Sequence, residues 1–583
     1  MLCHPSPKYL TERPIDPTHP VLESVPEALR PVYARRGIRS REDLDYRLSQ
    51  LPDPFLMQGM EAACLLLEEA LIKKDRILII GDYDADGATA TSLAHEGLKA
   101  LGASAVDYLV PNRFEYGYGL TPEIVELALR LKPSLLITVD NGITSLEGVE
   151  VARAMGVKVL ITDHHLPGAS LPRANAIVNP NLPGDPFPSR ALAGVGVMFY
   201  VLLALRKHLR NRKYFEVHQL PEPNLAELLD LVALGTVADV VPLDRINRIL
   251  VHQGLNRIRA GVSRPGIGAL LAVANKTPAE IAATDLGYSV GPRLNAAGRL
   301  DDMRLGIACL LAPTEALATS MAQSLDQLNR ERKSIEDAMR QDALSHLTDL
   351  PLPDQDAPVI CLFKEDWHPG VVGILASRIK DLVHRPVIAF AVNEMDPREL
   401  KGSARTVEGL HIRDLLAEVD AQQPGLIERF GGHAMAAGLT LKRDQLEAFE
   451  FLMKATAKRH LGSDHQEPRL TTDGCLPITD VNLERAEAIA RGGPWGQGFP
   501  EPLFEGTFKV RKTRIMAERH LRFTLEGSGP TADIEAIAFH VENPEAWVGI
   551  PSIKVAYRLE INAFRGNRTA QLKIVYMEAS ERT

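Results

Sequence analysis

A repeated alternation of short apolar runs and amphipathic segments constrains the fold of this chain more than any other feature. Apolar runs at residues 77–80, 135–139 and 157–161 are separated by polar loops and by segments with helical periodicity. Helices are expected at residues 121–131 and 145–155. Strands that alternate with helices in this way form a parallel, doubly wound sheet. The sequence therefore predicts an α/β fold for this part of the chain.

Acidic and imidazole side chains follow each of the three runs, at the end where open parallel sheets bind ligands. They are Asp82, Asp84, Asp86, Asp140, His164 and His165. A single aspartate in such a place is usually a helix cap or a turn residue. Capping does not explain three strand ends that carry acids and imidazoles, whereas a mixed oxygen and nitrogen site suits Mn²⁺, or Mg²⁺ with more water. Because the acids exceed the needs of one ion, two adjacent divalent cations are expected, an arrangement suited to displacement at phosphorus.

The later part of the chain has a different pattern of apolar residues from the strand–helix repeat. After Pro313, apolar residues recur every three or four positions apart from one longer step across Arg332, and no glycine or proline interrupts the run to Leu350, which predicts a long helix. Short alternating strands near the C-terminus predict a small antiparallel β-barrel resembling an OB fold. The expected parts are an N-terminal segment (1–50), an α/β domain (51–311), a connecting helix (312–350), a second α/β domain (355–461) and the barrel (470–583).

The composition restricts the class of protein. With 45% hydrophobic and 24% charged residues the chain is typical of folded, soluble proteins, and its net charge of −9 requires any polyanion-binding surface to be local. The five cysteines have no CxxC spacing, which suits a reducing compartment. The first residues lack the apolar core of a signal peptide, and the uncharged stretch at 191–205 is shorter than the roughly 18 residues that cross a bilayer. We expect a cytoplasmic protein without membrane contact, and a buried helix at 191–205.

Basic residues in two loops are candidates for phosphate contacts. Arg113 lies among aromatic residues in PNRFEYGYGL, a mixture that could hold a phosphate and stack bases, although an ordinary surface loop is an equal alternative. Arg293 and Arg299 in GPRLNAAGRL could bind phosphate or form structural salt bridges. The densest basic run, at 509–514, lies in the expected barrel, where a basic face would suit single-stranded DNA and a solvated strand edge is the alternative.

Four motifs, DYDADG, VDNG, DHH and GTVADVVPL, resemble in order and spacing those of the DHH phosphoesterase superfamily. Five further segments are similar to those of its bacterial single-strand-specific exonucleases. They are PNRFEYGYGL, GPRLNAAGRLDD, WHPGVVGI, GSAR and GGHAMAAG. Each motif alone is weakly specific, but the ordered set is highly specific and covers most of residues 40–583.

The resemblance implies roles for the acidic cluster. One ion would be bound by Asp86, Asp140, His164 and Asp239, and the other by Asp82 and Asp84 with Asp140 bridging. His165 would face the scissile phosphate, and Asp163 would orient a ligating imidazole. In the second α/β domain the residues that resemble phosphate-gripping elements are Ser403, Arg405, Gly432 and His433.

The function implied by the resemblance is metal-dependent 5′→3′ hydrolysis of single-stranded DNA to mononucleotides, in DNA recombination and repair. The expected partners of such a monomeric enzyme are a RecQ-type helicase and a single-stranded-DNA-binding protein. One alternative is a phosphodiesterase of cyclic dinucleotides or very short oligonucleotides, which would not need residues 470–583. Another is a non-catalytic replication scaffold, which would not need the complete set of acids found here.

Overall fold

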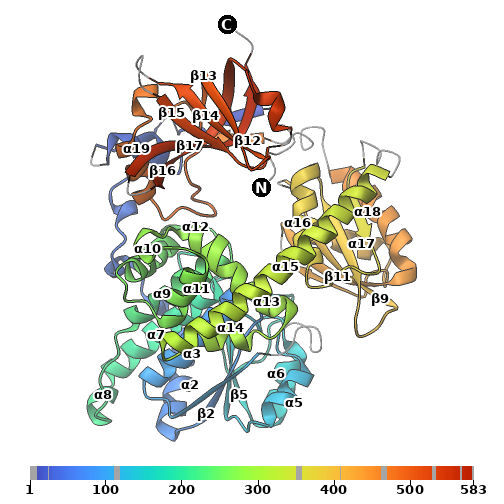
Figure 1. The fold of residues 1–583 in the computed structure, drawn as a ribbon. Coiled ribbons are helices and arrows are strands. Elements are labelled where there is room, and N and C mark those ends of the chain that lie inside the picture. The colour runs from blue at the N-terminus through green and yellow to red at the C-terminus, as the bar shows by residue number, and fades with distance from the viewer. Residues whose placement is uncertain are drawn as a thin grey trace. The chain divides into compact units, whose positions relative to one another are not determined.

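The computed structural model describes residues 9–16, 18–20, 22–23, 25–110, 119–349, 357–407, 409–432, 434–460, 469–527, 533–541, 543–564 and 567–580. The chain divides into two compact units. Figure 1 shows their helices and strands, coloured from the N-terminus to the C-terminus. The parallel-sheet unit consists of Glu42–Glu331 and Gly493–Pro500. The barrel unit consists of Met1–Arg41, Arg332–Gly492 and Glu501–Thr583.

The parallel-sheet unit is built on a five-stranded sheet in which every pairing is parallel. The strand order is β3-β2-β4-β5-β6. The strands are β2 (Arg76–Ile80), β3 (Ala105–Leu109), β4 (Leu135–Val139), β5 (Lys158–Thr162) and β6 (Ala176–Val178). The predicted α/β class and the three apolar strands are therefore confirmed.

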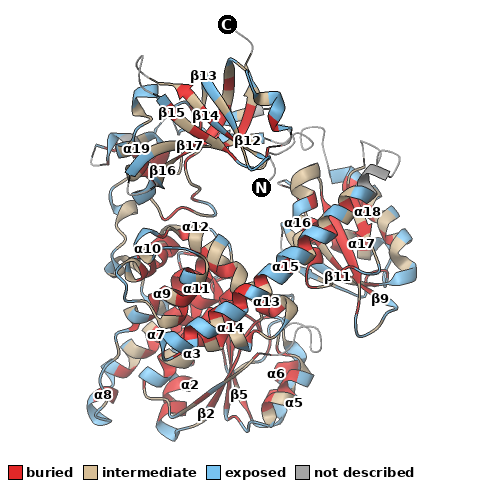
Figure 2. Cartoon of the chain, in the orientation of Figure 1, coloured by how far each residue is buried: buried red, intermediate tan, exposed pale blue. Residues whose placement is uncertain are grey.

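Helices cover both faces of this sheet, and Figure 2 shows the strands largely buried between them. Alternate strand residues such as Leu78 and Leu136 pack against α5 (Pro122–Leu129) and α6 (Leu146–Ala154). On the other side lie α2 (Met60–Lys73), α3 (Ala85–Ala100) and α7 (Gly194–Asn211). The buried helix expected at 191–205 is α7, which begins three residues later because the chain is still extended at Ala193.

A helical layer completes the unit. Its longer members are α9 (Leu229–Ala238), α10 (Arg245–Arg259), α11 (Pro265–Val273), α13 (Gly291–Leu300) and α14 (Arg304–Leu310). The first eight residues of α9 are all buried, since this helix packs against α3, α7 and α10. Its end delivers Asp239 toward the sheet.

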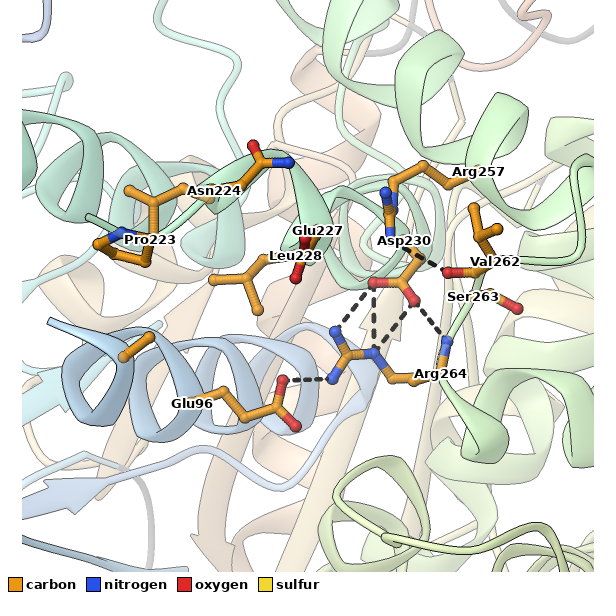
Figure 3. A pocket seen from close by; sticks show the side chains of 12 residues that line it. Glu96, Pro223, Asn224, Glu227, Leu228, Asp230, Arg257, Val262, Ser263 and Arg264 are labelled. Carbon is orange, nitrogen blue, oxygen red and sulfur yellow. Dashed lines mark hydrogen bonds and ion pairs between the residues drawn. The ribbon is translucent and has the colours of Figure 1, made fainter. Parts of the chain in front are cut away.

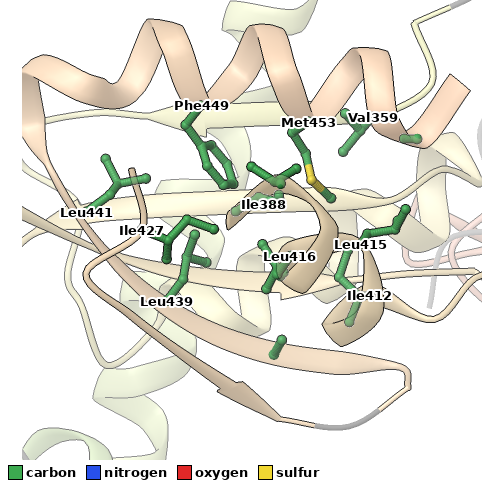
Figure 4. Packing of buried hydrophobic residues seen from close by; sticks show 14 of the residues in the cluster. Val359, Ile388, Ile412, Leu415, Leu416, Ile427, Leu439, Leu441, Phe449 and Met453 are labelled. Carbon is green, nitrogen blue, oxygen red and sulfur yellow. The ribbon is translucent and has the colours of Figure 1, made fainter. Parts of the chain in front are cut away.

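The second α/β domain lies within the barrel unit and has a mixed sheet in the order β10-β11-β9-β8-β7. The strands are β7 (Ile360–Phe363), β8 (Val387–Val392), β9 (Glu399–Arg405), β10 (Arg429–Gly432) and β11 (Ala436–Lys442). One face packs on α17 (Ile412–Gln422) and α18 (Leu446–His460), where Phe449 and Met453 meet Leu439 and Ile388 (Figure 4). The other face packs on α16 (Val372–Val383).

The predicted long helix is α15 (Glu315–Asp349). Its C-terminal half belongs to the barrel unit, where Met339 and Ala343 join the core around α16. Asp342 accepts hydrogen bonds from Trp367 Nε1 at 3.0 Å and Lys364 Nζ at 2.7 Å. These contacts fix the end of the helix to the second α/β domain.

The C-terminal strands close into a barrel in the order β13-β14-β15-β17-β16. They are β13 (Phe504–Met516), β14 (His520–Glu526), β15 (Asp533–Ala538), β16 (Ser552–Phe564) and β17 (Asn567–Ala579). One pair, β15 with β17, is parallel, so the barrel is not wholly antiparallel as the sequence suggested. The expected barrel itself is confirmed. No helix among the described residues is both long and apolar enough to cross a membrane.

The N-terminal segment packs with the C-terminal part of the chain. Strand β1 (Tyr9–Glu12) pairs in parallel with β12 (Arg469–Thr472). The buried side chains of Arg36 and Asp473 form an ion pair at 2.7 Å, and Tyr33 donates a hydrogen bond to the Gly492 carbonyl. The two ends of the described chain therefore stabilise each other, although the sequence alone gave no partner for the N-terminal segment.

Candidate metal centre

The acidic cluster lies where the strand order of the parallel sheet reverses. From β2 the chain crosses to β3 on one side and later returns to β4 on the other. In open α/β sheets, the crevice at the carboxyl ends of such neighbouring strands is the usual ligand site. Asp82 follows β2 and Asp140 follows β4, so both carboxylates start from this crevice.

Four of the predicted ligands converge on one point. The Nε2 atom of His164 lies 3.1 Å from Asp140 Oδ1, 3.5 Å from Asp239 Oδ2 and 4.0 Å from Asp86 Oδ2. All four residues are buried or nearly so, and His164 Nε2 and Asp239 Oδ2 are buried without a hydrogen-bond partner. Buried polar atoms normally have partners, and ligand atoms at these separations suit a shared cation with bonds of about 2 Å. The donor set therefore fits a divalent metal.

The carboxylate of Asp86 is held by the start of α7. Its Oδ2 accepts a hydrogen bond from the backbone N–H of Gly194 at 2.6 Å, and its Oδ1 accepts one from Val195 at 3.0 Å. A helix N-terminus favours a negative charge, since its first N–H groups have no partner within the helix. Asp84 instead caps α3, where its Oδ1 accepts a hydrogen bond from Gly87.

Asp163 organises the two histidines. Its Oδ1 accepts hydrogen bonds from the backbone N–H groups of His164 at 2.7 Å and His165 at 3.0 Å, while Oδ2 accepts one from Ile143. The ring that it contacts is that of His165, through Nδ1 at 2.7 Å. Asp163 therefore orients the ring of His165, which is expected to face the phosphate. It does not orient the ring of the predicted ligand His164, because the His165 ring is the one that turns back onto the carboxylate.

Burial and crowding perturb the pKa values of the cluster. Burial and the charge of Asp239 raise the pKa of Asp86 to about 7, and burial and Asp84 raise that of Asp239 to about 7. Burial, with repulsion from Asp86, also raises the pKa of Asp140. Burial lowers the pKa of His164, which favours the neutral, metal-binding form. Without a cation, the ionised cluster is electrostatically unfavourable.

This unfavourable charge predicts that the metal-free protein loses stability as the pH rises from 5 to 7. Asp86, Asp140 and Asp239 hold protons more tightly when folded, so their stabilising contribution disappears as the pH passes through the folded-state pKa values. The lowered pKa of His164 has the opposite effect, because His164 binds its proton less tightly when folded, but it is one group against three. We expect the melting temperature of the parallel-sheet unit in chelator to fall by at least about 5 °C, measured by scanning calorimetry. Saturating Mn²⁺ should remove the fall, and an unchanged or rising melting temperature in chelator would contradict this picture.

Two asparagines support the acidic cluster but were not predicted to do so from the sequence, although they lie in the quoted motifs. The Asn141 amide donates hydrogen bonds to the Val139 carbonyl at 2.9 Å and the Ile80 carbonyl at 3.3 Å, so it ties together the ends of β4 and β2. Asn295 on α13 accepts a hydrogen bond from the backbone N–H of Ala85 at 2.7 Å. Part of the GPRLNAAGRL motif therefore supports the DYDADG loop.

The arginines of the two candidate loops have different outcomes. Arg113 lies outside the described residues, as does His433. Arg293 forms an ion pair with Asp326 at 2.8 Å and donates to the Ser289 carbonyl, which is the structural alternative considered for it. Arg299 lies in the last turn of α13, partly exposed. The Arg293 guanidinium is therefore already occupied by contacts within the protein.

A second set of predicted residues gathers on the mixed sheet of the barrel unit. Arg405 Nη1 donates to Ser403 Oγ at 3.1 Å and to the Ala404 carbonyl, and burial lowers the pKa of its guanidinium. No carboxylate among the described residues pairs with it. A Cβ on Gly373, at the start of α16, would lie 2.9 Å from Ser403 Oγ and 3.1 Å from Arg405 Nη2. Glycine there leaves a helix N-terminus open beside a half-buried cation, which suits an anion.

Gly432, the other described member of this set, lies at the end of β10. Its φ of +140° is unusual for other residues, and a Cβ would lie 2.4 Å from the Ala436 carbonyl oxygen. Only glycine fits this position, which is a structural requirement that holds whether or not the loop binds phosphate.

A cavity of about 380 Å³ in the parallel-sheet unit lies apart from the acidic cluster. Its walls include Glu96, Asp230 and Arg264, and Arg264 bonds to Asp230 at 3.0 Å and to Glu96 at 2.8 Å (Figure 3). These three charged groups are paired with one another and therefore do not indicate a ligand. None of the predicted ligands lines it.

Three family models match the chain in order. The DHH family N-terminal domain matches residues 76–236, the DHHA1 domain residues 356–459 and the RecJ OB domain residues 472–576. The "Single-stranded-DNA-specific exonuclease RecJ" of Escherichia coli K12 is 48% identical over 97% of this chain and 98% of its own length. The protein of the same name from Thermus thermophilus is 34% identical over 96% of this chain and 76% of its own length.

Solved structures give the same result. The crystal structure of Thermus thermophilus RecJ in complex with Mn²⁺ matches with a TM-score of 0.78 and 33% identity, over 96% of this chain and 77% of that one. Its complex with Mg²⁺ matches with a TM-score of 0.73 and 31% identity, over 96% and 76% of the two chains. Since the domain order, the sequence and the structure agree over nearly the whole length, the chain belongs to the RecJ family of single-stranded-DNA-specific exonucleases.

Proposed function

We propose that this chain hydrolyses single-stranded DNA from the 5′ end, releasing mononucleotides, with two divalent cations at the acidic cluster. The observation that carries the proposal is the convergence of Asp86, Asp140 and Asp239 on His164 Nε2. Asp86, Asp140, His164 and Asp239 would hold one cation. Asp82 and Asp84, with Asp140 between, would hold the other.

The side chains around the cluster have distinct tasks in this reaction. When bound, the cations would supply Lewis-acid stabilisation of phosphate charge and lower the pKa of a water nucleophile. Asp163 holds the His165 ring at the edge of the cluster, where it can donate a hydrogen bond to the scissile phosphate. Asn141 fixes the two strand ends that carry Asp82 and Asp140. The protein thus contributes a prearranged set of charges, and little has to move during the reaction.

The barrel supports a single-stranded DNA substrate over a small nucleotide. On β13, Lys512 and Arg514 are exposed on one strand face, and Arg514 lies directly opposite Arg522 of β14. Arg522 is paired with Glu535 of β15 at 2.6 Å, whereas Lys512 and Arg514 form no ion pair among the described residues. A DNA backbone would supply the negative charge that these two side chains lack, whereas a phosphodiesterase of cyclic dinucleotides would have no use for this surface.

The direct test uses DNA labelled at one end, in single-stranded and duplex forms. Mn²⁺ or Mg²⁺ should support release of 5′ mononucleotides from the single strand, and chelator should stop it. Release from the 3′ end, or equal degradation of duplex, would contradict the proposal.

We further propose that the enzyme acts as a cytoplasmic monomer in recombination and repair, alongside a RecQ-type helicase and a single-stranded-DNA-binding protein. The absence of disulfides among the four described cysteines is compatible with that compartment.

We propose that Ser403 and Arg405 bind the 5′-terminal phosphate of the strand. The Arg405→Ala variant should lose a charge-assisted hydrogen bond of roughly 1.5 to 3 kcal/mol, and kcat/KM on 5′-phosphorylated strands should fall about tenfold to a hundredfold. Strands with a 5′-hydroxyl should be affected far less, as measured by kinetics on both substrates. Arg405→Lys should recover only part of the loss, because an ammonium does not reproduce the guanidinium fork. An equal fall on both substrates would remove Arg405 from end recognition.

A further inference from the structure

A segment between the second α/β domain and the barrel completes the parallel-sheet unit. Residues 493–500, GPWGQGFP, lie in sequence between α19 (Leu483–Arg491) and β13, yet they belong to the parallel-sheet unit. The rings of Trp495 and Phe499 are stacked, with centroids 5.1 Å apart and planes 13° apart. Phe499 is only 1% exposed. The segment is therefore part of the core of this unit and not a free linker.

The 493–500 segment packs on the residues that follow Asp239. The backbone N–H of Leu243 donates a hydrogen bond to the Gln497 carbonyl at 2.7 Å. The Arg248 guanidinium lies 4.4 Å from the centre of the Phe499 ring and donates to the Leu243 carbonyl at 2.9 Å. A Cβ on Gly498, whose φ is +71°, would lie 3.3 Å from Pro242 Cβ. Residues 242–248 are thus fixed by hydrogen bonding, ring stacking and close backbone approach.

The residue between this contact and the ligand is held in an unfavourable conformation. Val240 has a φ of +63°, which β-branched residues rarely adopt, and its side chain is 64% exposed. Such a conformation persists only where the flanking structure over-determines it. On one side Asp239 ends α9, bonded to the Gly235 carbonyl, and on the other side the chain is fixed to the 493–500 segment. Release of that contact would let Val240 relax and move Asp239.

The same loop also supports a second ligand. The Asn247 amide donates to the Pro242 carbonyl at 2.9 Å and to the Ala191 carbonyl at 2.6 Å. Ala191 lies just before Gly194, whose N–H group binds the Asp86 carboxylate. A shift of Pro242 would therefore disturb the support of Asp86 as well as the position of Asp239.

We propose that the 493–500 segment is a positioning element for the metal centre, acting on Asp239 and Asp86 through residues 240–248. The inference rests on the proposed function, because it takes these two residues as metal ligands. According to this proposal, residues 493–500 act on the metal centre and take no part in any binding of DNA by the barrel. Removing the whole C-terminal part could not test this, since it would delete the segment and the barrel together and strip β1 of its partner.

The test is Phe499→Ala in the full-length chain, which removes the ring beneath Arg248. Titration calorimetry of chelator-stripped protein should show Mn²⁺ binding weakened about tenfold, the lower end of the range for groups that support metal ligands. On a 5′-phosphorylated trinucleotide and on a long single strand, kcat should fall to a similar extent. A defect in DNA binding alone would instead raise KM on the long strand and leave kcat unchanged. Phe499→Leu, which keeps most of the apolar volume, should stay close to wild type.

Further variants keep the test decisive. Gly498→Ala places one methyl group against Pro242 at a positive φ and should reproduce the effect even if Phe499→Ala does not fold. Phe451→Ala, at a 74% exposed site on α18, is the matched control and should change nothing. Normal Mn²⁺ binding by Asp239→Asn would refute the proposed ligand set itself. Weakened binding by Asp239→Asn, with normal binding by the folded Phe499 and Gly498 variants, would overturn the positioning role alone.

Discussion

Replacing Asp140 with asparagine is expected to abolish DNA hydrolysis, with kcat reduced by at least about 10³-fold in Mn²⁺, which corresponds to roughly 4 kcal/mol. The carboxylate lies 3.1 Å from His164 Nε2 at the junction of β2 and β4 and is proposed to bridge both cations. Asparagine keeps the volume and removes the charge, so the measurement isolates metal binding from packing. Steady-state rates with Mn²⁺ varied over several decades would separate weak binding from loss of the site.

The same variant should make the metal-free protein more stable. Burial and repulsion raise the pKa of Asp140, so its ionised form opposes folding at neutral pH. In chelator at pH 7.5, Asp140→Asn should therefore melt above wild type, and added Mn²⁺ should stabilise it far less. Asp107→Asn, an exposed aspartate on the edge strand β3, is the control and should match wild type in both tests. Substantial activity of Asp140→Asn would exclude the bridging role.

The acidic cluster could be predicted from the sequence because a parallel sheet places the carboxyl ends of neighbouring strands at one edge. The carboxyl ends of adjacent parallel strands meet at one edge, so acids after β2 and β4 had to lie close together once the fold class was inferred. Asp239 was different, since it arrives from the end of a helix. Only the resemblance of GTVADVVPL to a family motif identified it. The apolar periodicity of a helix does not predict where the residue at its end lies relative to the sheet.

Other features could not be read from the sequence because they depend on long-range pairing. Strand β3 is an edge strand interrupted by the exposed Asp107, so it lacks the continuous apolar run of a strand buried on both faces. The pairing of β1 with β12 joins segments more than 450 residues apart, and no local pattern specifies such a partner. Likewise, the 493–500 segment reads as a glycine- and proline-rich linker, and only its stacked rings under Arg248 show its role.

Gly194 shows how closely the proposed ligands and the residues that support them are packed. A Cβ at this position would lie 2.5 Å from Asp140 Cβ and 2.6 Å from Asp140 Oδ1, distances that real Cβ atoms do not tolerate. Neither partner can yield easily: the Gly194 N–H holds Asp86 at 2.6 Å, and Asp140 is bonded through its backbone to the Thr162 carbonyl. Because a buried site has no free space for the added methyl group, either Asp86 or Asp140 has to move.

The Gly194→Ala variant is therefore expected to lower kcat on the order of a hundredfold, since displacements near 1 Å at a reactive centre have effects of this size. Mn²⁺ binding, followed by titration calorimetry, should weaken in parallel, although every proposed ligand is still present. Gly268→Ala is the matched control, because Gly268 also lies in a helix of this unit but no atom outside the local backbone of its own helix lies within 4 Å of the added Cβ. That control should keep full activity and gain up to about 1 kcal/mol from the better helix propensity of alanine. If Gly194→Ala bound Mn²⁺ and cleaved DNA as Gly268→Ala does, the close approach of α7 to Asp140 would have no part in placing the ligands.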